Sequence, residues 1–119
     1  MRKIEAIIKP SKLEEVKDAL LEAGIHGMTV TEARDFDGHT GSVPRGRRPV
    51  YVAEFHKLKI EIVLPTELVE AAVEAIVASA RTGSPGDGKI FVSKVERAIR
   101  TRTGESGGAA VEVAASLSL

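Results

Sequence analysis

The sequence contains no cysteine, which excludes a disulfide framework and any metal site built from thiolates. Its aromatic residues are three phenylalanines and one tyrosine, and its 17 basic side chains are balanced by 17 acidic ones. A dedicated nucleic-acid-binding protein would show a basic face or stacking rings. We therefore do not expect direct binding to nucleic acid.

Long apolar runs are also missing. No apolar stretch reaches the roughly 18 residues that a membrane-spanning helix needs, and charges interrupt the apolar residues of the first ten positions, unlike a signal peptide. We therefore expect a cytoplasmic protein that is not itself a membrane protein. With 119 residues, 43% of them hydrophobic, the chain fits one folded domain with a small core, so contacts between copies would supply part of the burial.

Hydrophobic periodicity predicts six elements in the order β-α-β-β-α-β. Ser11 and Glu14 have the spacing of a helix capping box. The order predicts an α+β, ferredoxin-like split βαβ domain, with both helices on one face of the sheet. The other face would be left open, which favours a homo-oligomer. The predicted strands span 2–9, 28–36, 51–64 and 90–97, and the predicted helices span 11–24 and 65–80.

Between 37 and about 50 the hydrophobic residues follow neither the helical nor the strand period, and glycine, proline and arginine are frequent. Structureless segments of this length inside a compact domain are usually functional or mobile. We therefore predict a long functional loop over 37 to about 50. The alternative is a solvated hairpin loop without a role.

A glycine-rich stretch follows the second predicted helix. From Gly83 to Lys89 it matches G-x-x-x-x-G-K, the start of a phosphate-binding P-loop. Ile90 stands where that motif needs Ser or Thr, and the next residues predict a strand instead of a helix, so the P-loop interpretation is rejected. An anion cradle with a lysine remains, and an ordinary helix-to-strand turn is the alternative. Further on, Arg100 and Arg102 would point the same way if the chain is extended there.

Several segments together resemble the P-II nitrogen-regulatory signal-transduction family. They are KIEAIIKP at 3–10, GMTVTE at 27–32, KIEIV at 59–63, TGSPGDGKIFV at 82–92 and IRTRTGE at 99–105. The resemblance implies one domain over 1–111, with a tail at 112–119, that assembles as a homotrimer. It also implies ATP or ADP bound in clefts between subunits, and a flexible T-loop, here about 37–56. The chain would then be a regulator and not an enzyme. Its T-loop would bind a target such as an ammonium channel or a metabolic enzyme.

The resemblance also implies site residues. Phosphates would meet the glycine-rich stretch and two arginines from a neighbouring subunit, while the adenine and ribose would meet residues of the second and third strands. The nucleotide-binding residues implied are Thr29, Asp37, Gly38, Glu61, Val63, Gly86, Asp87, Gly88, Lys89, Arg100 and Arg102.

The chain departs from the family at 37–41. It reads DGHTG there, where the family has a Gly-Arg-Gln-Lys-Gly type of segment whose glutamine helps to bind Mg2+ with 2-oxoglutarate. His39 falls at the glutamine position and is either a metal ligand or a solvated side chain. Lys57 matches the lysine that pairs with the 2-oxoglutarate carboxylate. Tyr51 falls near a tyrosine that is uridylylated in some bacterial members of the family.

These departures leave two alternative functions open. One is a sensor of ADP or AMP together with another small anion, such as bicarbonate. The other is a slow ATPase, although the sequence shows no paired carboxylates and no Ser/His arrangement for catalysis.

Overall fold

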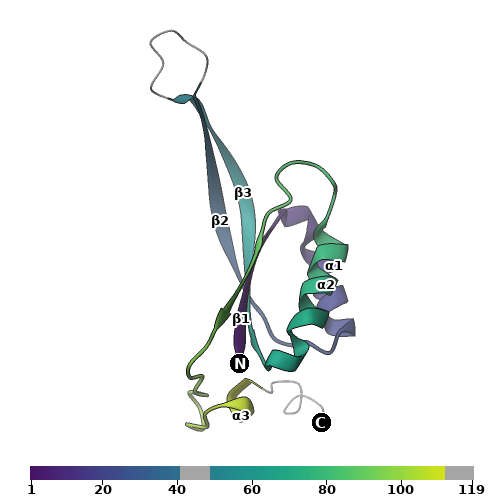
Figure 1. Cartoon of the computed structure of the whole chain (residues 1–119), viewed down its shortest axis with the longest axis vertical. Helices are drawn as coiled ribbons and strands as arrows, with labels where there is room; N and C mark the ends of the chain where they lie inside the picture. The colour runs from purple at the N-terminus through teal and green to yellow at the C-terminus, as the bar shows by residue number, and fades with distance from the viewer. Residues whose placement is uncertain (41–48, 112–119) are drawn as a thin grey trace.

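The computed structural model describes residues 1–40 and 49–111 of the chain. Four strands form one sheet in the order β2-β3-β1-β4, and every neighbouring pair is antiparallel. The helices α1 and α2 lie together on one face of this sheet (Figure 1). The strands are β1 (Arg2–Ile8), β2 (Thr29–Thr40), β3 (Pro49–Leu64) and β4 (Ile90–Lys94), and the helices are α1 (Leu13–Glu22), α2 (Val69–Ala80) and the short α3 (Gly108–Val111).

The core lies between the helices and the sheet. Alternate residues of β1 and β3 face the helices, and their register places Ile4 opposite Ile62 and Ala6 opposite Ile60. All four side chains are buried, as are Val16 and Leu20 of α1 and Ala72 and Ile76 of α2. This arrangement confirms the predicted ferredoxin-like α+β class, with both predicted helices on one face.

The open face of the sheet carries a network of charged side chains. Lys3 of β1 forms ion pairs with Glu5, at 3.2 Å, and with Glu61 of β3, at 3.0 Å, and Lys59 lies 3.4 Å from Glu61. The exposed apolar side chains near the outer strand β4 are Phe91, Val92 and Ile99. An outer strand with exposed apolar side chains is a surface that another chain can cover.

The strands β2 and β3 form a long hairpin that projects beyond the rest of the domain (Figure 1). The prediction of a structureless segment over 37 to about 50 was wrong for 37–40 and 49–50, which are strand; Asp37 pairs with Ala53, Gly38 with Val52 and His39 with Tyr51. Backbone pairing can extend a hairpin past the residues whose side chains show a strand pattern. The middle of the predicted loop, 41–48, and the predicted tail, 112–119, lie outside the described residues.

Three further local predictions need correction. The capping box of Ser11 and Glu14 does not form: a 3-10 turn over Pro10–Lys12 precedes α1, and no side chain caps the helix. The last strand ends at Lys94 instead of 97. The chain at 101–103 is a turn and not an extended segment.

No helix within 1–40 or 49–111 is long and apolar enough to cross a membrane.

Candidate functional site

The glycine-rich stretch 82–89, called the glycine loop below, is closed by one carboxylate. Asp87 accepts hydrogen bonds from the backbone N–H groups of Thr82 and Gly83, both at 3.0 Å, and from the Thr82 hydroxyl. Lys9, at the end of β1, lies 3.4 Å from the same carboxylate. The Thr82 hydroxyl, followed by the two N–H groups and Lys9, holds the pKa of Asp87 far below its usual range. The carboxylate of Asp87, predicted to take part in the nucleotide site, therefore holds the loop in shape.

Two glycines give the loop its path. Gly86 and Gly88 have φ values of +91° and +97°, a region that favours glycine. At Gly88 a Cβ atom would lie 1.8 Å from the carbonyl oxygen of Ile7. The next residue, Lys89, accepts a hydrogen bond from the N–H of Ile7 at 2.9 Å. A glycine at 88 thus lets the loop run directly against β1 before β4 begins.

Lys57 ties the hairpin to the glycine loop. Its side-chain amine donates a hydrogen bond to the carbonyl of Gly86, and the residue is only 5% exposed, the one buried charged residue among those described. Its Nζ also lies 5.9 Å from the centre of the Phe55 ring. The structure therefore places the predicted effector lysine beside the predicted phosphate cradle.

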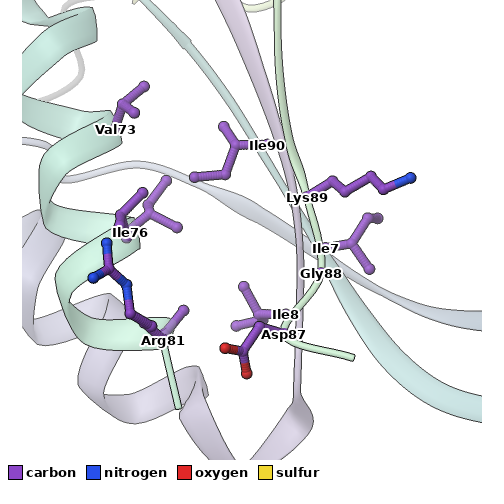
Figure 2. Close-up of a pocket in the computed structure, with 11 residues that line it drawn as sticks. Ile7, Ile8, Val73, Ile76, Arg81, Asp87, Gly88, Lys89 and Ile90 are labelled. Carbon is purple, nitrogen blue, oxygen red and sulfur yellow. The ribbon is translucent and has the colours of Figure 1, made fainter. Parts of the chain in front are cut away.

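Lys89 faces away from the helices. Figure 2 shows the side chains of Lys89 and Ile7 pointing to the side opposite α2, while Ile8 and Ile90 point toward it. The Lys89 side chain is exposed and forms no hydrogen bond or ion pair with the described part of the chain. A cation in this position is available to an anion from outside.

Arg100 and Arg102 lie beyond the other end of β4. Their turn is closed by hydrogen bonds from Gly104 N–H to the Arg100 carbonyl, at 2.7 Å, and from Arg100 N–H to the Glu105 carbonyl, at 2.8 Å. The glycine loop precedes β4 and this turn follows it, with a strand rise of about 3.3 Å per residue between them. A single chain therefore does not bring Lys89 and the two arginines together.

Thr29, Glu61 and Val63 lie on neighbouring strands. Thr29 pairs with Glu61 across β2 and β3, and Val63 pairs with Lys3 across β3 and β1. A hydrogen bond from Lys3, followed by the charges of Lys3 and Lys59, lowers the pKa of Glu61. Thr29 begins one outer strand and the glycine loop leads into the other, about three strand spacings of roughly 4.8 Å apart. Within one chain, the residues predicted to contact adenine and ribose therefore lie far from the glycine loop predicted to contact the phosphates.

The hairpin carries the remaining predicted residues. Asp37 and Gly38 lie in β2, and His39 lies directly opposite Tyr51 in the register of β2 and β3. Among the residues that the structure describes, no three His, Asp or Glu side chains gather as a metal site would require.

The prediction from the sequence did not name Lys9 or Thr82 as site residues, although Thr82 belongs to the glycine-rich stretch. Thr82 stands at the start of the glycine-rich segment, which was a usable signal. Lys9 is 73 positions away from Thr82, and no pattern in the sequence connects the two.

Known proteins match the chain over nearly its whole length. The family model described as nitrogen regulatory protein P-II matches residues 1–105. The nitrogen regulatory protein P-II of Rhodobacter capsulatus is 57% identical over 112 residues, which cover 93% of this chain and 100% of the relative. That of Nostoc punctiforme is 54% identical over the same shares of both chains.

A solved structure agrees with these relatives. Arabidopsis thaliana PII bound to citrate superposes with a TM-score of 0.77 at 41% identity, over 92% of this chain and 88% of the other. The resemblance inferred from the sequence is confirmed, and the chain belongs to the nitrogen regulatory protein P-II family.

Proposed function

We propose that this chain is a non-enzymatic signalling protein that assembles as a homotrimer and binds ATP or ADP in clefts between subunits. The observation that carries the proposal is the division of the site. The glycine loop with Lys89 lies at one end of β4, and Arg100 and Arg102 follow the other end. A polyphosphate can touch both groups only where two copies of the chain meet.

One copy supplies the phosphate cradle. Gly86 and Gly88 have backbone conformations that other residues rarely adopt, and such loops turn N–H groups toward an anion. Asp87 fixes the loop through Thr82 and Gly83, so the cradle is formed before the ligand arrives. Lys89 adds its charge to the outer phosphates.

The neighbouring copy supplies the rest of the cleft. Arg100 and Arg102 reach the phosphates, since guanidinium groups suit bidentate contacts with them. Thr29, Glu61 and Val63 would surround the adenine and ribose. The exposed apolar side chains Phe91, Val92 and Ile99 would be covered in the trimer, which supports an interface along β4.

The signal would pass through Lys57. This lysine joins the carbonyl of Gly86 to β3, and β3 continues into the hairpin that carries the T-loop. A ligand that changes the glycine loop would therefore change the hairpin, provided that it binds the two states with unequal affinity. A target such as an ammonium channel or a nitrogen-metabolism enzyme would engage this hairpin.

A second candidate function concerns the effector. The segment at 37–41 lacks the family's arginine and glutamine, which favours a sensor of ADP or AMP with another small anion, such as bicarbonate, over one of 2-oxoglutarate. Mg2+ would bind together with the nucleotide. His39, at the position of the family's glutamine, would be its candidate protein ligand. The related plant PII binds citrate, which supports a small anion as partner of this fold.

Calorimetric titration tests the proposal. Each charge-assisted hydrogen bond contributes roughly 1.5–3 kcal/mol, so Lys89→Ala and Arg102→Ala should each weaken ATP binding by about one to two orders of magnitude. Lys89→Ala should harm ATP more than AMP, because the lost charge faces the outer phosphates. Titrations with ATP, ADP and AMP, with and without Mg2+, 2-oxoglutarate and bicarbonate, separate the two candidates. Parent-like ATP binding by both variants would refute the phosphate cradle.

A further inference from the structure

A cavity of about 380 Å³ lies between α2 and the start of β4, on the side of the glycine loop that faces the helices (Figure 2). Ligand pockets in proteins measure about 300–1,000 Å³ and are mostly apolar, and this cavity fits both descriptions. Its apolar wall is made of Ile8, Val73, Ile76, Val77, Ala80 and Ile90. It shares Asp87, Gly88 and Lys89 of the glycine loop as lining residues, but the Lys89 side chain points to the opposite side of β4, away from α2.

Arg81 supplies a cation at the edge of this cavity. Its backbone N–H bonds to the carbonyl of Val77 at 3.1 Å, which fixes the residue directly after α2. Its guanidinium group is exposed and makes no hydrogen bond or ion pair with residues 1–40 or 49–111. An unpaired guanidinium beside an apolar wall favours a ligand that has an anionic head and an apolar body.

Asp87, the acidic residue of the lining, does not favour a cationic head. A carboxylate offers about four lone-pair positions. One oxygen of Asp87 already accepts from the Thr82 hydroxyl and faces Lys9, and the other accepts from the N–H groups of Thr82 and Gly83. Three hydrogen bonds and the ion pair with Lys9 thus already compensate the charge of this carboxylate, so it attracts the ammonium group of an amine less than an unpaired carboxylate would.

We propose that this cavity is a binding site for a small aliphatic monocarboxylate, with its hydrocarbon chain against α2 and its carboxylate on Arg81. The inference concerns the face of the glycine loop that looks toward α2, and it does not depend on nucleotide binding on the other face. Each methylene group that enters the cavity should tighten binding roughly fourfold, until the cavity is full.

The experiment is an NMR titration of the isotopically labelled full-length protein without nucleotide. The probes are butanoate, hexanoate and octanoate, with hexylamine and hexanol as head-group controls. The amides of Val77, Gly88 and Ile90 should shift saturably with the acids, and affinity should rise with chain length. Hexylamine should cause no saturable shift.

Two variants separate the head from the chain. Arg81→Gln should weaken hexanoate about tenfold and leave hexanol unchanged, while Arg97→Gln, at an exposed arginine outside the cavity, should bind hexanoate like the parent. Val77→Phe adds a ring to the wall and should remove binding of all three acids. The proposal is overturned if hexylamine binds as well as hexanoate, or if Arg81→Gln binds hexanoate as the parent does. Because Arg81 is exposed, that variant decides the question even if Val77→Phe does not fold.

Discussion

The amine of Lys57 donates a hydrogen bond to the carbonyl of Gly86, and this contact joins the hairpin to the glycine loop across 29 positions of sequence. The lysine is buried and the carbonyl has no other described side-chain partner. A hydrogen bond from a charged donor contributes about 1.5–3 kcal/mol. The contact therefore contributes to stability as well as to communication between the two segments.

Lys57→Met should lower the free energy of unfolding by about 1.5–3 kcal/mol, because methionine fills the space but cannot make the charge-assisted hydrogen bond to the Gly86 carbonyl. Urea unfolding measures the change. Lys17→Met is the control, since Lys17 is exposed on α1 and forms only a surface ion pair with Glu14 at 3.5 Å. That control should change stability by less than about 0.5 kcal/mol. Equal effects of the two substitutions would show that the Gly86 contact is not stabilising.

Two glycines of the same loop provide a matched pair. Gly83→Ala should cost about 1–2 kcal/mol, the strain of a side chain at positive φ, because nothing lies within 4 Å of the added Cβ. Gly88→Ala should cost clearly more, since its Cβ would lie 1.8 Å from the Ile7 oxygen and must push β4 away from β1. Thermal and urea unfolding of both variants compare the two costs. A Gly88→Ala protein as stable as Gly83→Ala would contradict the close approach to β1.

Asp87 should make stability depend on pH. Because its pKa in the folded chain is lowered, its contribution is fully present above the unfolded value of about 3.9 and is lost as pH falls toward the folded value. The parent should therefore be more stable than Asp87→Asn at pH 7, and the gap should shrink below about pH 4. Unfolding experiments from pH 7 to 3 measure the gap, with Asp18→Asn, at an exposed position of α1, as control. A stability difference between parent and Asp87→Asn that stays constant over this range would count against a stabilising role of the ionised Asp87 carboxylate.

The order of elements could be predicted from the sequence because local periods encode it. Ile4, Ala6 and Ile8 alternate along β1, and all three are buried. The length of the hairpin could not be predicted, since β2 continues past Phe36 through backbone pairing, for which Asp37 and Gly38 give no signal.

The candidate site was only partly predictable for a similar reason. Glycine spacing identified the loop, but its closure depends on Lys9 and Asp87, which lie far apart in the sequence. The burial of Lys57 likewise depends on where Gly86 falls in three dimensions. Both contacts join residues that are far apart in the sequence, so no local pattern predicts them.

The division of the site predicts that two defective chains can repair each other. In a trimer whose clefts each take Lys89 from one copy and Arg102 from the next, a mixture of Lys89→Ala and Arg102→Ala chains places one intact cleft in every mixed trimer. Calorimetry on the refolded mixture should therefore recover a fraction of sites with parent affinity for ATP, about one in three per mixed trimer. Neither variant alone, nor a chain that carries both substitutions refolded with itself, should show such sites. If both residues served one cleft from the same chain, no mixture of the two variants would contain an intact cleft, and recovered affinity would be absent.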